Sequence, residues 1–169
     1  YAPAGNKDAV SVAFKKAFER VEQLNQIASD YLPESEILRF AKTSVGERFA
    51  MSADLFAIFT TAESIATETD GAFDVTAGPL VRLWRLSRKN RELPDEGQIS
   101  RARSRIGFHL LGMNPTDRTV VKMSEGMLFD LGGIAKGYAA DEALRILKDS
   151  GFPSSLVAAS GDIVVGDSP

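Results

Sequence analysis

The order of hydrophobic patterns along this chain constrains its fold more than any other feature. Apolar residues recur at three- and four-residue steps from about Asp8 to Ala28 and from about Ala53 to Glu68, which is the period of one helix face. From His109 onward the pattern becomes strand-like, with a further helical segment from about Ile134 to Asp149. This order predicts an α+β fold, with N-terminal helices packed on mostly antiparallel strands, rather than a doubly wound sheet.

Each of the first two long helices is expected to bury one apolar stripe. Ser52 stands where the N-cap of the second helix should be, and Asp70-Gly71 follows its last turn. Ser35 is a candidate cap for a short helix between them that begins near Ile37. The expected stripes are Val10, Phe14, Ala17, Val21, Leu24 and Ala28 in the first long helix, and Leu55, Ile58, Phe59, Ala62, Ile65 and Ala66 in the second.

Two hairpins are predicted in the last third of the chain. Thr119–Met123 and Met127–Leu131 are short apolar runs separated by Ser-Glu-Gly, which is a hairpin signal. Ser155–Ala159 and Ile163–Val165 are expected to pair around a turn that Asp162 helps to close. His109 has apolar neighbours and is interpreted as a packed strand residue.

The middle of the chain is rich in arginine. The pattern predicts a short helix at Leu80–Leu86, after Pro79, and a short basic helix at Gln98–Ile106. Between them, the highly charged stretch Ser87–Gly97 is expected to be a solvated excursion. A solvated basic face is the common explanation of such a patch, and recognition of an acidic partner is the alternative. The arginines are Arg82, Arg85, Arg88, Arg91, Arg101, Arg103 and Arg105.

Composition excludes several classes of protein. The chain has 169 residues, a formal charge of −3 and 44% hydrophobic residues, which are values of a globular domain. It contains no cysteine and one histidine, so a disulfide framework, a thiolate metal site and a multi-histidine metal site are excluded. No run of about 18 apolar residues is present, so we expect no membrane span. The acidic balance argues against nucleic acid as a partner.

The segment Asp130–Asp141 carries the clearest chemical signal. A predicted strand ends in Asp130, two glycines make the turn, and a helix begins with Lys136 in its first turn. Backbone N–H groups at a helix N-terminus suit a phosphate or pyrophosphate, and Asp130 could orient a ligand hydroxyl or help to hold a cation. The spacing matches neither the P-loop nor the dinucleotide-binding fingerprint. A tight turn without a ligand is the equally open alternative.

Two further segments are weaker candidates. Gly71–Val81 has the glycines and proline of an ordered loop, from which Phe73 and Asp74 could clamp a flat ligand. A purely structural turn is the commoner outcome for such a loop. Tyr31 lies in a polar loop and could stack on a ring system, although a tyrosine that anchors its loop is more common.

Together these segments resemble the ApbE family, the FAD:protein FMN transferases. The resemblance extends from about Val10 to Gly166, so residues 1–169 are expected to form a single region of the family domain. It rests on Ser29-Asp30-Tyr31 with Ser35-Glu36-Ile37, on Gly71–Val81 with Leu83-Trp84, on Asp130–Asp141, and on Ser160-Gly161-Asp162-Ile163, which is similar to the family's Gly-Gly-Asp-Ile.

The resemblance implies a flavin site and a reaction. The enzyme would cleave FAD, transfer FMN to a threonine or serine hydroxyl of a target flavoprotein, and release AMP, with Mg²⁺ neutralising charge on the phosphates. It also implies a periplasmic location and a possible lipid anchor. Alternatives are an FAD-binding module without catalysis and an FAD pyrophosphatase that forms FMN and AMP. The implied FAD contacts are Tyr31, Ala72, Phe73, Asp74, Asp130 and Lys136, and the backbone oxygen of Gly133 is an implied Mg²⁺ ligand.

The chain departs from the family pattern in several places. No Met-Gly-Thr strand precedes Asp8, and no His-Ile-Ile-Asp-Pro-like stretch or Asp/Thr pair of Mg²⁺ ligands follows Gly166. Ala41 stands where the family has asparagine, and Ser160 where it has glycine. We therefore expect an incomplete polypeptide whose C-terminal part is missing or supplied by a second chain, with a shortened, non-catalytic relative as the alternative.

Overall fold

The structure is a computed structural model that describes residues 6–168. The chain divides into two compact units. The larger unit is continuous and runs from Ala28 to Leu131, whereas the smaller combines the chain up to Ile27 with the chain from Gly132. Within residues 6–168, no helix has the length and apolar character needed to cross a membrane. Helices and antiparallel strands occur in both units, which confirms the predicted α+β class.

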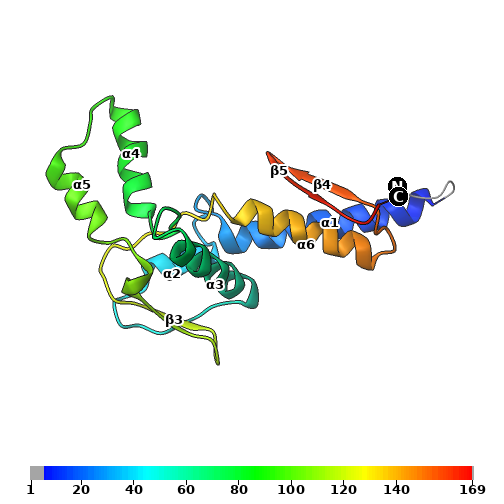
Figure 1. Cartoon of the computed structure of the whole chain (residues 1–169), viewed down its shortest axis with the longest axis horizontal. Coiled ribbons are helices and arrows are strands. Elements are labelled where there is room, and N and C mark those ends of the chain that lie inside the picture. The colour runs from blue at the N-terminus through cyan, green and yellow to red at the C-terminus, as the bar shows by residue number, and fades with distance from the viewer. Residues whose placement is uncertain (1–5, 169) are drawn as a thin grey trace. The chain divides into compact units, whose positions relative to one another are not determined.

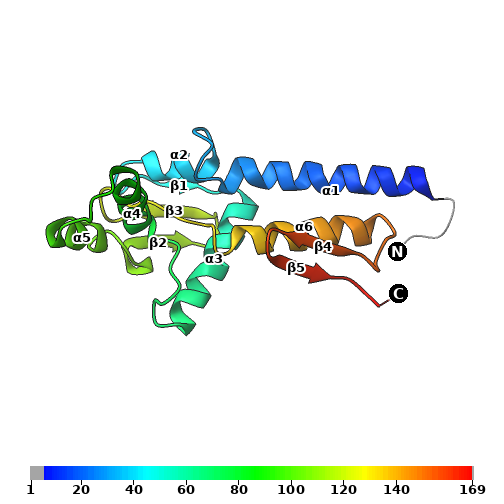
Figure 2. The same cartoon turned by 90° about the horizontal axis from the view of Figure 1, so that it is seen from above.

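The smaller unit consists of two helices and one hairpin. Helices α1 (Lys7–Ala28) and α6 (Ala135–Asp149) run side by side, and strands β4 (Leu156–Ala159) and β5 (Asp162–Val165) lie along α6 (Figures 1 and 2). The strands pair antiparallel, and Ser160 in the turn has a φ of +61°. The predicted third long helix and the last hairpin are thus confirmed.

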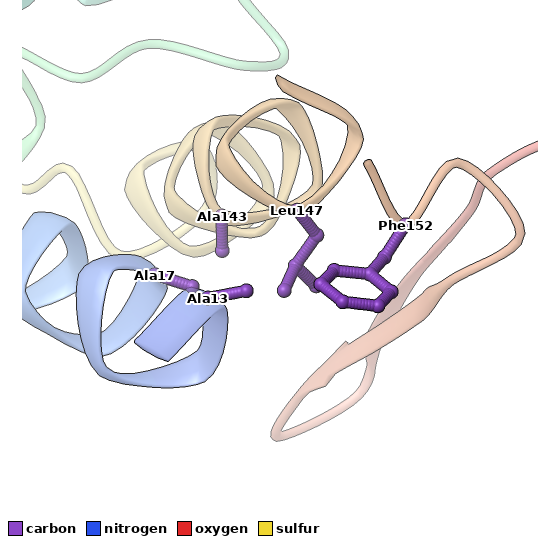
Figure 3. Packing of buried hydrophobic residues seen from close by; sticks show 5 residues of the cluster. All are labelled: Ala13, Ala17, Ala143, Leu147 and Phe152. Atoms are coloured by element: carbon purple, nitrogen blue, oxygen red, sulfur yellow. The ribbon is translucent and has the colours of Figure 1, made fainter. Parts of the chain in front are cut away.

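Small side chains form the core of the smaller unit. Ala13 and Ala17 of α1 face Ala143 and Leu147 of α6, and Phe152 closes the cluster (Figure 3). Alanines at a helix contact allow the two backbones to approach closely. Gly151 has a φ of +89°, which glycine adopts without strain, so α6 can end and Phe152 can turn back onto the cluster.

An ion pair also joins the two helices of this unit. The guanidinium of Arg20 on α1 donates to the Glu142 carboxylate of α6 at 2.7 and 2.8 Å, and Arg145 donates to the same carboxylate. Hydrogen bonds from Arg145 and Arg20 lower the pKa of Glu142 from its usual 4.5 to about 2. An ion pair that is largely shielded from solvent therefore joins α1 to α6 in addition to the apolar cluster.

The buried stripe of α1 departs from the predicted one at Phe14, which is 50% exposed. Ala17 and Leu24 are buried as predicted, and Ala13 is buried in addition. Val10 and Val21 pack against the core of this unit. Ala13 and Ala17 occupy the face of α1 that packs against Ala143 and Leu147 of α6, so Phe14 lies off this contact. Phe18, which lies outside the predicted stripe, is 72% exposed. The two aromatic rings instead line an apolar groove of about 480 Å³, formed by α1, α6 and β4.

The larger unit contains a small antiparallel sheet of three strands. Its strand order is β1-β3-β2, with β3 between its two neighbours (Figure 2). Its elements are α2 (Glu36–Lys42), β1 (Phe49–Ala50), α3 (Ala53–Glu68), α4 (Gly78–Asn90), α5 (Glu96–Arg103), the 3₁₀ turn η1 (Phe108–Leu110), β2 (Leu111–Asn114) and β3 (Thr119–Lys122).

Aromatic packing dominates the core of this unit. The Phe40 ring stacks on Phe129 with centroids 4.9 Å apart, and Phe59 meets both rings edge-on, at 6.0 and 5.3 Å. Phe40 and Phe59 are completely buried. The predicted caps are confirmed, because the Ser35 and Ser52 hydroxyls accept hydrogen bonds from the first turns of α2 and α3. The larger unit thus buries its main aromatic residues by itself.

The predicted hairpin of Thr119–Met123 with Met127–Leu131 is wrong. Strand β3 pairs instead with β2 and with β1. The turn before β3 selects this pairing, because Asn114 and Asp117 side chains accept hydrogen bonds from N–H groups two residues later and Arg118 adopts a φ of +54°. His109 lies in η1 and is exposed, so the prediction of a packed strand residue is also wrong.

The charged stretch Ser87–Gly97 is largely exposed, as predicted, but both of its ends are helical. Helix α4 begins at Gly78 and continues to Asn90, where Arg91 in the left-handed conformation ends it. Helix α5 begins at Glu96 because Asp95 and Gln98 form a reciprocal capping box. Only a short connection separates two helices that pack as a hairpin (Figure 1).

Candidate functional site

Two of the predicted motifs meet in the larger unit. The Asp130 N–H donates to the Val75 carbonyl oxygen at 2.8 Å, and Ala77 forms a parallel bridge with Leu128. The ordered loop at Gly71–Pro79 therefore lies directly along the segment that ends in Asp130, although 50 residues of sequence separate them. Residues 128–130 therefore run along this loop, whereas β3 pairs with β1 and β2.

Gly78 permits this close approach. A β-carbon at residue 78 would lie 2.4 Å from the Leu128 carbonyl carbon and 2.6 Å from the Phe129 nitrogen. Backbone atoms cannot yield in the way that a flexible side chain can, so any other residue would push the two segments apart. The need for glycine here arises from backbone contact rather than from backbone conformation.

The Asp74 side chain shapes the loop. Its Oδ1 accepts hydrogen bonds from the Thr76 N–H at 2.8 Å and from the Thr76 hydroxyl at 2.7 Å. The buried Thr76 hydroxyl in turn accepts from the Gly107 N–H at 2.6 Å. At least one carboxylate oxygen of Asp74 therefore has a structural role, and Thr76 is a supporting residue that the sequence interpretation did not single out.

Ala72 and Phe73 occupy the start of the same loop. Ala72 is exposed and Phe73 is partly buried. The Phe73 N–H donates to the Thr69 hydroxyl at the end of α3, at 3.1 Å. Gly71 before them has a φ of +77°. Both residues thus follow a sharp exit from the helix and stay accessible on the surface of the larger unit.

Arg85 links Tyr31 with Asp130. Its guanidinium donates to the Asp30 carboxylate at 2.6 Å and lies 3.6 Å from the Asp130 carboxylate. The same guanidinium lies 5.3 Å from the centroid of the Tyr31 ring, which is 77% exposed. The hydrogen bond with Asp30 raises the pKa of Arg85 above its usual value, so this group is a permanent cation.

A pocket of about 250 Å³ lies beside this cluster. Asp30, Arg85 and Asp130 contribute its charged wall, and α2 and α4 supply apolar side chains. Ala41 also lines it, and its carbonyl oxygen accepts a hydrogen bond from the buried Lys122 amine at 2.6 Å. Burial lowers the pKa of Lys122. A ligand in this pocket would meet two arginines, Arg82 and Arg85, and two carboxylates. The exposed Tyr31 ring lies against Arg85 and is not part of the lining.

The sequence interpretation included Arg85 only in the general basic patch. Its position relative to Gly78 is the signal that could have found it, because residues i, i+4 and i+7 share one helix face. With α4 starting at Gly78, that face carries Arg82 and Arg85 toward the segment that Gly78 contacts. The predicted start at Leu80 concealed this relationship.

Gly133 and Lys136 belong to the smaller unit. Gly133 is exposed in the turn before α6. Lys136 lies in the first turn of α6, and its amine donates to the Gly132 carbonyl oxygen at 2.7 Å. Lys136 is exposed as well, so both residues are accessible to a ligand.

The described residues do not make a magnesium site by themselves. Across residues 6–168, no group of three or more histidine, cysteine, aspartate or glutamate side chains is placed to hold a metal ion. Gly133 offers one backbone oxygen, whereas Mg²⁺ takes six ligands in octahedral geometry. We therefore assign no chemical step of this chain to a metal.

Comparison with known proteins identifies relatives of this chain. The FAD:protein FMN transferase of Chlamydia muridarum is 33% identical over 131 residues, which are 75% of this chain and 42% of that protein. The Escherichia coli K12 protein of the same name is 30% identical over 141 residues, or 81% of this chain and 40% of its own length. The chain therefore spans about two fifths of these curated relatives.

Solved structures share the fold. The flavin transferase ApbE from Vibrio cholerae matches with a TM-score of 0.84 and 27% identity, covering 92% of this chain and 50% of that one. The apo form of Pseudomonas stutzeri flavinyl transferase ApbE matches with a TM-score of 0.83 and 27% identity, covering 92% and 52%. The ApbE family model matches residues 4–169. The chain belongs to the ApbE family.

Proposed function

We propose that this chain is the FAD-facing part of an FAD:protein FMN transferase. The observation that carries the proposal is the joining of the Gly71–Pro79 loop to Asp130, with Arg85 connecting Asp130 to the exposed Tyr31. One small region of the larger unit then presents an aromatic face, a cation and carboxylates. These are the groups that recognise a flavin ring and the hydroxyl groups of its side chain. The names of the relatives support the same reaction.

In the proposed reaction, a phosphoryl-linked group moves from FAD to a protein. The oxygen of a threonine or serine hydroxyl on the acceptor forms a bond to the phosphorus of the FMN half. The bond from that phosphorus to the bridging oxygen breaks, and AMP leaves with the bridging oxygen. The hydroxyl gives up its proton, and we assign no base. The residues of this chain supply binding and orientation, which account for most catalysis of phosphoryl transfer.

Each candidate residue has a proposed role in holding FAD. Tyr31 offers an exposed ring for the isoalloxazine. Ala72 and Phe73, at the start of the Gly71–Pro79 loop, offer accessible surface for a contact with FAD. Asp130 would accept hydrogen bonds from hydroxyl groups of the ligand, and Lys136 would neutralise phosphate charge. Asp74 would act through the loop conformation that its bonds to Thr76 maintain.

Magnesium dependence and location are further parts of the proposal. The resemblance implies that the Gly133 carbonyl oxygen contributes to a Mg²⁺ site, for which the remaining ligands would come from outside the described residues. It also implies action on the periplasmic side of a bacterial inner membrane, with a lipid anchor. Fractionation of cells that produce the protein tests the location.

Product analysis tests the function. The protein containing this chain is incubated with FAD, Mg²⁺ and a candidate flavoprotein acceptor. We expect acceptor protein whose mass has increased by FMN, together with one equivalent of AMP. FMN and AMP without labelled acceptor would indicate an FAD pyrophosphatase. Tight FAD binding without AMP would indicate a binding module, and absence of both binding and turnover would contradict any flavin function.

A further inference from the structure

The second pocket of the larger unit lies between the helices of the α4–α5 hairpin. Its volume is about 330 Å³, which is at the lower end of the range for small-ligand sites. Three leucines, a proline and an alanine supply apolar lining, and three arginines line the same pocket. The lining residues are Pro79, Arg82, Leu83, Leu86, Gln98, Arg101, Ala102, Arg105, Gly126 and Leu128, none of which is acidic.

Two of the arginines are packed against glycine positions. The Arg105 guanidinium lies over Gly126, with Nη1 3.0 Å and Cζ 3.2 Å from where a β-carbon would stand. The Arg101 Nη1 lies 3.2 Å from the corresponding position at Gly97. The absence of side chains at both glycines leaves room for the guanidinium groups beside the pocket.

The three arginines differ from Arg85 in their charge environment. In the part of the chain that the structure describes, no carboxylate forms an ion pair with Arg82, Arg101 or Arg105, whereas Arg85 pairs with Asp30 and Asp130. The nearest acidic neighbour in sequence to Gly126 is Glu125, whose charge acts on Lys122. The Asp95 Oδ1 and the Arg101 Nη1 each lie 3.2 Å from the β-carbon position at Gly97, so Arg101 has a carboxylate nearby without an ion pair. The pocket thus combines an apolar floor with three arginines that form no ion pair within residues 6–168, which suits a ligand that is both anionic and apolar.

This pocket adjoins the candidate flavin pocket. Arg82 and Leu128 line both. A group bound between α4 and α5 would therefore be a neighbour of FAD rather than a part of its binding site. In the proposed reaction, the second substrate beside FAD is the acceptor protein.

We propose that the α4–α5 pocket binds an acidic segment of the acceptor protein, with an apolar residue next to its carboxylates. The proposal rests on the transferase function. Arginine guanidinium groups would hold the carboxylates in paired hydrogen bonds, and Leu83 and Leu86 would contact the apolar neighbour. The pocket would thereby hold the acceptor near the reacting phosphate.

The main test is the double variant Arg101→Ala/Arg105→Ala, with Arg103→Ala as its matched control. Arg103 lies on α5 as Arg101 does, two residues before Arg105, and is exposed, but it does not line the pocket. In the transfer assay we expect the double variant to raise KM for the acceptor about tenfold or more, since two charge-assisted contacts are lost. The kcat and the FAD affinity should stay at the parent values, and Arg103→Ala should change none of the three.

A binding assay separates this proposal from the transferase function. Fluorescence anisotropy measures binding of a labelled peptide of alternating leucine and aspartate, with a leucine–asparagine peptide for comparison. Selective binding of the acidic peptide that is lost in the double variant supports an acidic-segment site even if no FMN transfer occurs. Transfer with an unchanged KM in the double variant overturns the pocket proposal and leaves the function intact. The pocket proposal is also overturned if Arg103→Ala loses as much peptide binding as the double variant does. The same holds if inorganic phosphate, at an equal concentration of negative charge, displaces the labelled peptide as well as the unlabelled acidic peptide does.

Discussion

The two units of this chain bury their apolar residues in different ways. The larger unit packs Phe40, Phe59 and Phe129 into one aromatic cluster around its sheet. The smaller unit relies on alanines between α1 and α6 and leaves Phe14 and Phe18 on its surface. The larger unit, which holds Tyr31, Arg85 and Asp130, therefore depends on buried aromatic rings for its stability more than the smaller unit does.

Truncating the two types of phenylalanine should give the largest difference. Phe40→Ala removes a buried ring from the larger core, and the free energy of unfolding should fall by about 3–5 kcal/mol. Phe18→Ala in the smaller unit removes a ring that is 72% exposed and should cost less than about 0.5 kcal/mol. Urea denaturation of both variants measures the effects. Comparable losses would show that the two cores do not differ as described.

Two glycine substitutions sharpen the same contrast. Gly78→Ala forces a β-carbon into the backbone at Leu128, so we expect a loss of about 1–3 kcal/mol in unfolding free energy. Gly137→Ala places a methyl group on α6 where nothing lies within 4 Å, and better helix propensity should stabilise by about 0.5–1 kcal/mol. Thermal denaturation should therefore shift in opposite directions. A stabilising Gly78→Ala would refute the close contact of the two motifs.

The ion pair of the smaller unit predicts an acid dependence. The pKa of Glu142 is lowered from 4.5 to about 2, so its contribution to stability is present above pH 4.5 and is lost as the pH falls toward 2. In Glu142→Gln, the drop in unfolding free energy between pH 6 and pH 3 should be smaller than in the parent by about 1–2 kcal/mol at most. The rest of the drop remains because other carboxylates also titrate in this range. Denaturation curves at pH 6 and pH 3 measure it. Asp141→Asn, an exposed change on the same helix, should keep the parent's pH dependence.

The elements that depend on local pattern were predictable from the sequence. Helices α1, α3 and α6 follow apolar periods with clear caps or stops, and the β4–β5 hairpin follows two short runs around Ser160. The meeting of Gly71–Pro79 with Asp130 was not predictable from periodicity, because it depends on one glycine that allows two distant backbones to touch. The partner of β3 was not predictable either, because a short apolar run does not specify which strand it pairs with.

The sequence identified several residues of the candidate site, but not the contacts that join them. Tyr31, Phe73 and Asp130 stand out in motifs, whereas Arg85 resembles six other arginines of a basic stretch. Its role follows from the true start of α4, which places it two turns after Gly78 on the same face. The structure was also needed to separate the role of Asp74 from that of Asp130. Asp74 accepts hydrogen bonds from Thr76 and so shapes its own loop.

The smallest predicted effect concerns Arg85. Arg85→Ala removes the cation between Tyr31 and Asp130, so FAD affinity should fall about three- to tenfold through loss of their alignment. Arg85→Lys keeps the charge and should recover part of the affinity. Arg88→Ala, on the same helix, is the control and should bind FAD as the parent does. Tryptophan and flavin fluorescence titrations provide the dissociation constants, and an unchanged value in Arg85→Ala would contradict the linking role.

The central claim is that Asp130, held against the Gly71–Pro79 loop, contacts FAD. Its most direct test is titration of FAD fluorescence with the parent protein, Asp130→Ala and Glu63→Ala, a control on the exposed face of α3. Loss of one charge-assisted hydrogen bond should weaken FAD binding by about 1.5–3 kcal/mol in Asp130→Ala and leave Glu63→Ala unchanged. Equal affinities of all three proteins, or no FAD binding by the parent, would contradict the account.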